Sequence, residues 1–266
     1  MASTTNTALI TGASSGIGAI YADRLAKRGW NLILTALDAS DLESVALKLR
    51  KATGASVETM AGDLSHPSDL KRVEARIGEA DELRLLINNA GSAAAGGFVG
   101  VDADAQERLI RLNVVAVTRL VSAAIPRFVA AGGGSIVNIS SVVGLSPELA
   151  NGIYGPTKAF VLSYSQALAV ELDPLGIYVQ AVLPSIVRTK IWESVGRSLD
   201  GLPGVMEPGD LVDAALVGFD RKERVTIPVL DQQAWDAFET ARRDLLKGVY
   251  KELPAERYRC PSRGGD

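Results

Sequence analysis

Cysteine and histidine are almost absent from this chain. Its 266 residues include one cysteine, Cys260, and one histidine, His66. A single cysteine excludes a disulfide framework within the chain, which is typical of a protein of the reducing cytosol. His66 has no cluster of cysteines or carboxylates beside it, so we interpret it as a surface residue and expect no metal site.

Strong charge and long apolar runs are lacking as well. The formal net charge is −3 and the pI is about 5.4, so the chain has no basic footprint for nucleic acid or an acidic membrane. No run approaches about eighteen uninterrupted apolar residues. The N-terminus lacks a basic region ahead of an apolar stretch, so we expect no secretory signal. These absences predict a cytoplasmic protein whose partners are small molecules, with no nucleic acid and no membrane.

Apolar strands alternate with helical patterns along the chain. We expect strands over residues 7–11, 31–36, 55–61, 83–88, 135–139, 175–183 and 224–230. Strands that are apolar throughout, alternating with amphipathic helices, predict a parallel sheet covered on both faces. Right-handed crossovers make this a doubly wound α/β sheet, with ligands at the carboxyl ends of its strands. We expect one domain over residues 1–254 and a flexible tail over residues 255–266.

A glycine-rich turn follows the first expected strand at once. Residues 11–18 read Thr-Gly-Ala-Ser-Ser-Gly-Ile-Gly, and helical spacing begins after them. Glycines allow a tight turn and a close approach of the backbone to phosphate, and the amides of a helix N-terminus favour a pyrophosphate. This context predicts a dinucleotide site, and a tight turn without a ligand is the less favoured interpretation.

The end of the second expected strand leaves the choice of dinucleotide open. An acidic residue there selects NAD through the ribose hydroxyls, and a basic residue favours NADP. Ala36 and Leu37 are neither, and Asp38 comes one residue later, where it can cap the next helix. Ala36 leaves room for a phosphate but supplies no charge for it. We therefore expect NADP or NAD, with a slight preference for NADP.

Polar residues in the second half of the chain form a candidate catalytic set. Asn113 interrupts a long apolar helical pattern, where a buried amide must find partners. The fifth expected strand ends in Ser140-Ser141, and Tyr154 follows Ser141 by thirteen residues. Lys158 comes one helical turn after Tyr154, so its ammonium can lower the pKa of the phenol. Alone, such a pair is more often a solvated surface pair.

Together, these motifs resemble the short-chain dehydrogenase/reductase family. The resemblance implies a Rossmann-like, mostly seven-stranded parallel sheet. It also implies an NAD(P)-dependent oxidoreductase acting on CH–OH groups, which interconverts a ketone or aldehyde with an alcohol. The match covers roughly residues 6 to 230. Its motifs are Thr11-Gly12-x-x-x-Gly16-x-Gly18, Asn88-Asn89-Ala90-Gly91, Asn113, Ser141, Tyr154-x-x-x-Lys158 and the Pro-Ser-Ile-Val-Arg-Thr loop over 184–189.

The resemblance also implies a role for each matched residue. Tyr154 would be the acid/base that exchanges a proton with the substrate oxygen, and Lys158 would lower its pKa and bind the nicotinamide ribose. Ser141 would hydrogen-bond the substrate oxygen, and Asn113 would hold a water of the proton relay. Cofactor contacts are expected from Gly12, Ser14, Ser15, Gly16, Ile17, Gly18, Asp63, Leu64, Asn89, Ala90, Gly91, Tyr154, Lys158, Pro184, Ile186 and Thr189.

The chain departs from the family pattern in three places. Leu37 stands where NADP-preferring members often have arginine, and Ser185 replaces a common glycine. Pro156 and Thr157 replace the commoner small residue and serine; in the first turn of a helix the proline is tolerated. Ser140 competes with Ser141 for the catalytic role, and the spacing to Tyr154 favours Ser141.

Two segments outside the motifs allow several interpretations. Residues 190–204 could cover the substrate or form a plain surface helix. Residues 233–250 have helical apolar spacing and form an extra C-terminal helix that could pack on its own subunit, reach a neighbour or close the cleft. Two long helices are apolar on more than one side, which indicates a homodimer or homotetramer. The alternative function is an NAD(P)-binding sensor or scaffold without turnover, against which the intact catalytic set argues.

Overall fold

The computed structural model describes residues 6–93, 97–149, 152–194, 196 and 198–259. The chain divides into two compact units, Met1–Pro228 and Val229–Asp266. The first unit carries the sheet and all the motifs of the sequence. The second carries the extra C-terminal helix. A single domain over residues 1–254 stays a prediction.

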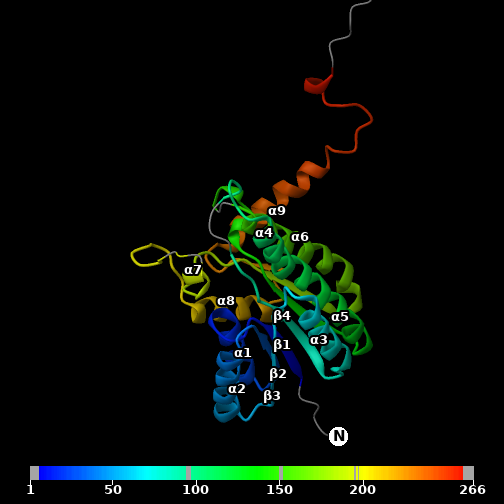
Figure 1. The fold of residues 1–266 in the computed structure, drawn as a ribbon. Helices are drawn as coiled ribbons and strands as arrows, with labels where there is room; N and C mark the ends of the chain where they lie inside the picture. The colour runs from blue at the N-terminus through cyan, green and yellow to red at the C-terminus, as the bar shows by residue number, and fades with distance from the viewer. Residues whose placement is uncertain (1–5, 94–96, 150–151, 195, 197, 260–266) are drawn as a thin grey trace, which may run out of the picture. The chain divides into compact units, whose positions relative to one another are not determined.

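The first unit is built on a seven-stranded parallel sheet (Figure 1). The order β3-β2-β1-β4-β5-β6-β7 reverses direction between β1 and β4, and a doubly wound sheet has its ligand crevice at that point. The predicted α/β fold is therefore confirmed. The strands are β1 (Thr7–Thr11), β2 (Asn31–Ala36), β3 (Val57–Ala61), β4 (Leu83–Asn88), β5 (Gly134–Ile139), β6 (Ile177–Val182) and β7 (Val225–Thr226).

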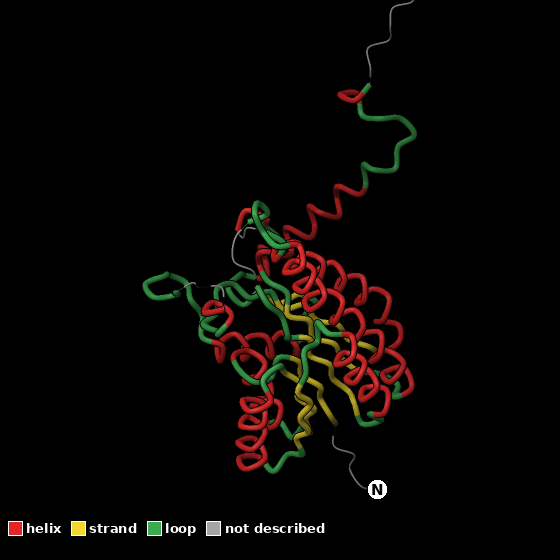
Figure 2. The backbone as a smooth tube through the Cα atoms, viewed as in Figure 1, coloured by secondary structure: helices red, strands yellow, loops and turns green. Residues whose placement is uncertain are grey.

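Helices cover both faces of this sheet, as Figure 2 shows with the strands in yellow between red helices. Buried side chains of α1 (Gly16–Lys27), α2 (Ala39–Thr53) and α8 (Pro208–Asp220) form the core on one face. Those of α3 (Pro67–Glu79), α5 (Val117–Ala130) and α6 (Tyr154–Leu172) form the core on the other. Because both faces are covered, the strands are apolar throughout rather than alternating.

The long apolar helical pattern around Asn113, expected over residues 104–129, consists of three parts in the structure. A π-helical segment, Arg111–Ala116, joins α4 (Ala103–Ile110) to α5, and it contains Asn113. By length and composition alone, Ala103–Ala130 could cross a membrane. However, α5 buries Leu120, Val121, Ala124 and Phe128 in the core under the sheet. This stretch is therefore a core helix of the fold.

Two short elements follow β6. The segment expected over 190–204 contains a single helical turn, α7 (Ile191–Ser194), and is otherwise irregular within the residues that the structure describes. Strand β7 spans only two of the seven residues expected over 224–230. Pro228 lacks the backbone N–H that a longer ladder would need, so the strand ends before it.

The second unit contains α9 (Gln232–Leu246), close to the helix expected over 233–250. Asp231 caps it by accepting a hydrogen bond from the Gln233 amide. Glu239 forms ion pairs with Arg242 and Arg243 along the same helix. A short 3₁₀ turn, Glu256–Tyr258, lies within the expected tail, whose last residues, 260–266, fall outside the described part. The three roles considered for this helix stay predictions.

Gly18 allows α1 to contact the glycine-rich turn closely. A methyl group at this position would lie 2.3 Å from the Gly12 carbonyl oxygen and 2.5 Å from Asn89 Nδ2. Both neighbours belong to the turns that close the crevice, so they cannot move without opening it. Gly78, inside α3, has nothing within 4 Å of the same position.

These two helical glycines give a matched test of packing at the crevice. We expect Gly18→Ala to lower the free energy of unfolding by about 1–3 kcal/mol, because the added methyl overpacks backbone. Gly78→Ala should leave it unchanged or raise it by up to about 1 kcal/mol, because alanine is the better helix former. Urea unfolding measures both. Equal effects of the two substitutions would contradict this account of Gly18.

Candidate active site

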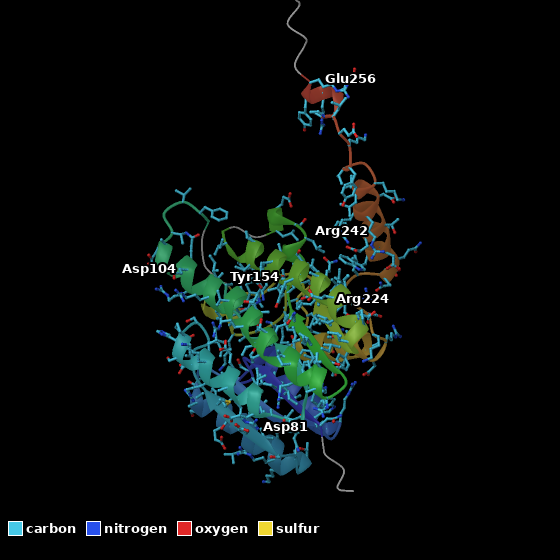
Figure 3. The ribbon with its side chains drawn as sticks, turned by 90° about the vertical axis from the view of Figure 1, so that its right-hand side faces the viewer. Asp81, Asp104, Tyr154, Arg224, Arg242 and Glu256 are labelled. Atoms are coloured by element: carbon cyan, nitrogen blue, oxygen red, sulfur yellow. The ribbon has the colours of Figure 1, made fainter. Side chains whose placement is uncertain are left out.

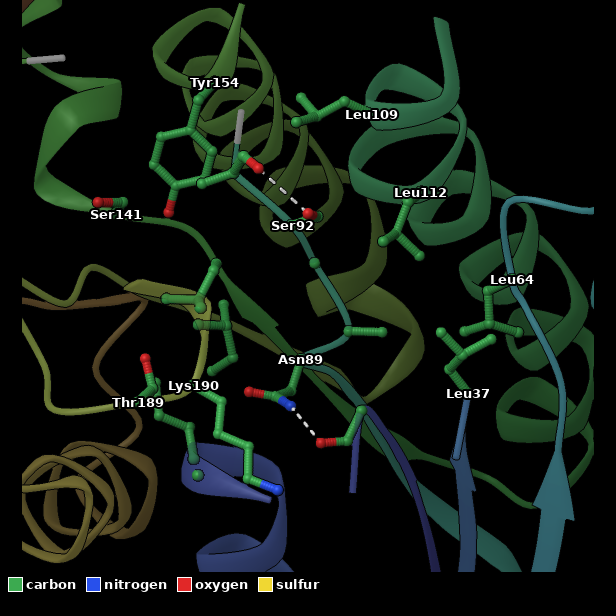
Figure 4. Close-up of a pocket in the computed structure, with 18 of the residues that line it drawn as sticks. Leu37, Leu64, Asn89, Ser92, Leu109, Leu112, Ser141, Tyr154, Thr189 and Lys190 are labelled. Carbon is green, nitrogen blue, oxygen red and sulfur yellow. Dashed lines mark hydrogen bonds between the residues drawn. The ribbon is translucent and has the colours of Figure 1, made fainter. Parts of the chain in front are cut away.

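A cavity of about 780 Å³ lies at the carboxyl ends of the strands (Figure 4). Figure 3 shows Tyr154 toward this end of the first unit, with Asp104 of α4, and Asp81 at the far end. The cavity wall comes from the glycine-rich turn, the ends of β2 to β5, helices α4 and α6, and the loop after β6. Its size is typical of a ligand site.

Thr11 and Asn89 tie together the ends of β1 and β4. The Thr11 hydroxyl accepts hydrogen bonds from the Asn89 and Ala90 amides at 2.9 and 2.8 Å. The Asn89 Nδ2 donates to the Thr11 and Gly12 carbonyls at 2.9 and 3.1 Å, the second of which is drawn in Figure 4. These bonds hold the two turns side by side at the point where the strand order reverses.

The residues around the glycine-rich turn fit a dinucleotide. Gly12 (φ +66°) and Gly16 (φ +53°) both adopt the left-handed conformation that glycine tolerates best. A methyl group at Gly12 would lie 2.9 Å from the Ala90 Cα, so only a bare backbone fits there. The Ser15 side chain makes no cap hydrogen bond to α1. First-turn amides of α1 are thus left for an anion such as a pyrophosphate.

One side of the cavity carries a group of apolar side chains. Figure 4 shows Leu37, Leu64 and Leu112 grouped on one side, where an adenine ring would find flat apolar contacts. Asp63 lies next to them, and its Oδ1 accepts hydrogen bonds from the Ser65 amide and hydroxyl at 2.8 and 2.7 Å. The carboxylate is therefore held at the cavity wall.

Tyr154 and Lys158 lie one turn apart at the start of α6. Figure 4 shows the Tyr154 hydroxyl directed into the cavity on the side of Ser141. Lys158 is buried; its Nζ donates to the Ile139 carbonyl at 2.9 Å and lies 5.7 Å from the centre of the Tyr154 ring. Pro156 sits in the first turn of the helix, where a missing amide breaks no helical hydrogen bond.

Burial dominates the titration of both side chains. It raises the pKa of Tyr154, and the hydrogen bond with Ser141 opposes that rise. It also lowers the pKa of Lys158 to about 8. The sequence alone indicated a lowered pKa for Tyr154, through the neighbouring ammonium. In the structure without a nucleotide the direction is the reverse, because desolvation of the phenolate outweighs the other effects.

The two adjacent serines have different surroundings. Ser140 is buried, and its hydroxyl donates to the Lys158 carbonyl at 2.7 Å, which anchors α6 to the end of β5. The Ser141 hydroxyl makes a longer bond, 3.3 Å, to the Pro184 carbonyl. Its interaction with Tyr154 places it beside the phenol. The geometry therefore favours Ser141 over Ser140 as the residue that meets a substrate.

Asn113 uses its side chain to connect three elements. Its Oδ1 accepts from the Ser92 amide at 3.0 Å, and its Nδ2 donates to the Ser92 carbonyl and Thr157 Oγ1 at 2.9 and 3.1 Å. Thr157 in turn donates to the Tyr154 carbonyl at 2.7 Å. Asn113 does not line the cavity and instead positions the start of α6. A water held by Asn113 stays a prediction.

The structure gathers nearly all the expected cofactor residues around one cavity. Gly18 and Ile186 are the exceptions: Gly18 serves packing, and the Ile186 carbonyl accepts from the Met206 amide at 2.9 Å. Ser185 lines the wall beside Ile186, with a buried hydroxyl that has no partner among the described residues.

Several lining residues were not foreseen. Ala105, Leu109 and Leu112 share one helical face, so their spacing could have indicated a common wall. Lys190 and Trp192 lie in a loop without a motif and carry no such signal. Ser92 and Thr157 contact Asn113, and only the folded chain brings these three together.

Comparisons with known proteins agree with this site. Residues 6–200 match the family model of short-chain dehydrogenases. An uncharacterized oxidoreductase from Staphylococcus saprophyticus is 30% identical over 224 residues, which cover 83% of this chain and 93% of that protein. It supports the same assignment over most of the chain.

Two solved structures are more similar. A short-chain dehydrogenase from Sphingobium yanoikuyae, in complex with NADPH, is 55% identical with a TM-score of 0.93, covering 96% of this chain and 100% of that one. A bulky-bulky ketone specific alcohol dehydrogenase from Comamonas testosteroni is 48% identical with a TM-score of 0.89, covering 96% and 99%. A match over 96% of the chain must extend past Pro228. The chain is thus an NAD(P)-dependent oxidoreductase that interconverts carbonyl and alcohol groups, and it belongs to the short-chain dehydrogenase family.

Proposed function

We propose that this protein interconverts ketones carrying large groups on both sides of the carbonyl with the corresponding alcohols, and that it uses NADPH and NADP. The observation that carries the catalytic part of the proposal is the Tyr154 hydroxyl, directed into the cavity beside Ser141 and one helical turn from Lys158. Asn113, through Thr157, positions this set.

Tyr154 is the acid/base in this proposal. Because burial raises its pKa, the phenol is protonated at neutral pH and can donate a proton to a carbonyl oxygen. The Ser141 hydroxyl holds that oxygen within reach of the phenol. When bound, the nicotinamide supplies or accepts the hydride. Gly91 packs closely against this set, since a methyl group there would lie 3.3 Å from Asn113 Oδ1 and 3.4 Å from the Lys158 Nζ.

Lys158 stabilises the deprotonated form of Tyr154 in this proposal. With a pKa of about 8 it is an ammonium at neutral pH, and the Ile139 carbonyl orients it. An ammonium at this distance favours the phenolate that remains after Tyr154 has given up its proton. The same group can donate to the hydroxyls of a bound ribose.

The preference for large ketones has two supports. The cavity lining includes Leu109, Ile191 and Trp192, which offer apolar surface to large substituents. In addition, the 48% identical protein from Comamonas testosteroni is specific for such ketones.

The preference for NADPH also has two supports. Residues Ala36 and Leu37, at the end of β2, provide no carboxylate to bind ribose hydroxyls. The 55% identical protein from Sphingobium yanoikuyae binds NADPH.

We also propose an oligomeric state and a cellular location for this protein. Val170 of α6 is 70% exposed, and the stacked rings of Phe160 and Tyr164 lie on the same helix. Such apolar groups on an outer helix favour a homodimer or homotetramer. The lone cysteine and the modest net charge favour a cytoplasmic location.

Removal of the phenolic hydroxyl tests the catalytic assignment. We expect Tyr154→Phe to lower kcat by about 10²–10⁴-fold, because general acid–base catalysis is lost, while the Kd for NADPH changes little. Tyr164→Phe removes the same group from the same helix outside the cavity and should leave kcat unchanged. Comparable turnover in Tyr154→Phe would refute the role of this residue.

The burial of Lys158 predicts a pH dependence of stability. The unfolded lysine has a pKa of about 10.4, so between pH 8 and 10 the unfolded chain binds more protons than the folded one. The cost of burying the ammonium is therefore greatest below pH 8 and fades as the pH rises. Without nucleotide, Lys158→Met should be more stable than the natural protein at pH 7.5. We expect that difference to shrink by about 2 kcal/mol by pH 9.5.

Urea unfolding of both proteins at several pH values measures this effect. Other titrating groups are common to the two proteins and cancel in the difference. A difference that does not change with pH would show that Lys158 keeps its ordinary pKa when folded.

A ketone panel tests the substrate class. With NADPH, we expect kcat/KM for ketones with two large substituents to exceed that for small methyl ketones by about 10–100-fold, because added apolar groups gain contacts in the pocket. Absorbance of NADPH follows the reaction. A preference for small ketones would overturn the substrate class and leave the catalytic assignment intact.

A further inference from the structure

Lys190 brings a cation to the dinucleotide cavity from a loop without a motif. It follows Thr189 after β6 and lines the cavity, and Figure 4 shows its side chain extended there. Its Nζ lies 3.1 Å from Oδ2 of Asp41, a residue 149 positions earlier in the chain. Asp41 belongs to the first turn of α2. The ion pair thus connects the loop after β6 to the helix after β2.

The contact with Asp41 places the ammonium near the expected ribose site. In a doubly wound sheet, the group on the 2′ carbon of the adenosine ribose meets the end of the second strand. Here β2 ends at Ala36, Leu37 follows it, and both line the same cavity as Lys190. An ammonium within hydrogen-bond distance of the first turn of α2 is therefore beside the position of a 2′-phosphate.

A 2′-phosphate at the end of β2 needs a cation beside it. The lining residues from the glycine-rich turn and the end of β2, Ser14, Ser15, Ala36 and Leu37, are neutral, and Asp63 after β3 is a carboxylate. The other described cations that line the cavity, Arg108 and Lys158, belong to α4 and α6. Two carboxylates lie close by: Asp38 caps α2 by accepting from the Asp41 amide at 2.7 Å, and Asp41 itself is 51% exposed. Without a cation, they would repel a phosphate.

The lysine can also reach a bound phosphate. Its side chain is 65% exposed, and its flexible stem allows the ammonium to contact both Asp41 and a neighbouring anion.

We propose that Lys190, positioned by Asp41, binds the 2′-phosphate of NADPH and sets the preference of this protein for NADPH over NADH. This assignment rests on the proposed function. It adds the residue that replaces the basic side chain missing at Leu37. The specificity element then lies on the loop after β6 rather than at the end of β2.

Nucleotide binding, without turnover, tests the assignment. Lys190→Met removes the charge and keeps most of the stem. We expect the Kd for NADPH to rise about 5- to 30-fold, because one charge-assisted contact to the 2′-phosphate is lost. The Kd for NADH should stay within about twofold, because NADH has no 2′-phosphate. Adenosine 2′,5′-bisphosphate and adenosine 5′-monophosphate should show the same contrast. Titration calorimetry with these fragments measures binding of the adenosine part of the nucleotide without the nicotinamide.

Two further variants serve as controls. Arg188→Met removes a charge from the same loop, where the arginine pairs with Glu207 at 2.9 Å and does not line the cavity, so all Kd values should stay within about twofold. Lys190→Arg should keep the preference for NADPH, since a guanidinium also binds phosphate.

Equal weakening of NADPH and NADH in Lys190→Met, or no change in either, would overturn the role of Lys190. In those outcomes the natural protein still binds NADPH, so the proposed function stands. If the natural protein binds neither nucleotide, the proposed function fails and Lys190 loses its role with it.

Discussion

The hydrogen bonds between Asn89 and the end of β1 are the interaction on which the rest of the site depends. They join the two strands between which the sheet reverses its order, and so they define the crevice. Helix α1 can approach these same atoms only because Gly18 has no side chain. Gly91, two residues after Asn89, lines the same cavity and packs closely against Lys158. The hydrogen bonds of Asn89 therefore help to position both the glycine-rich turn and the residues next to Lys158.

The start of α6 is held from several directions at once. Ser140 anchors the carbonyl of Lys158, and Thr157 connects the helix to Asn113 in the π-helical segment. A π-helical turn in a long helix is often associated with a functional site, since it redirects a side chain. Here it turns Asn113 toward Ser92 and Thr157. These contacts offset part of the cost of burying Lys158 beside a carbonyl instead of a carboxylate.

The loop after β6, which carries no motif after Thr189, contributes several side chains to the cavity wall. Trp192 lines the cavity, and Lys190 reaches the first turn of α2 from the same loop. A loop of this kind can vary while the strands and the catalytic helix stay constant. In the proposals above, the choice of substrate and the choice of dinucleotide are both located on this one short segment, apart from the shared chemistry of Tyr154.

The sequence by itself determined the doubly wound sheet, the glycine-rich turn and the Tyr154–Lys158 pair. These features depend on local periodicity and on backbone freedom at single glycines, which neighbouring residues reveal. The tertiary structure decided the rest. Burial reversed the expected direction of the Tyr154 pKa, because desolvation depends on everything that surrounds the phenol. It separated the roles of Ser140 and Ser141, and it brought Lys190 to Asp41 across 149 positions of chain, a contact that no spacing in the sequence encodes.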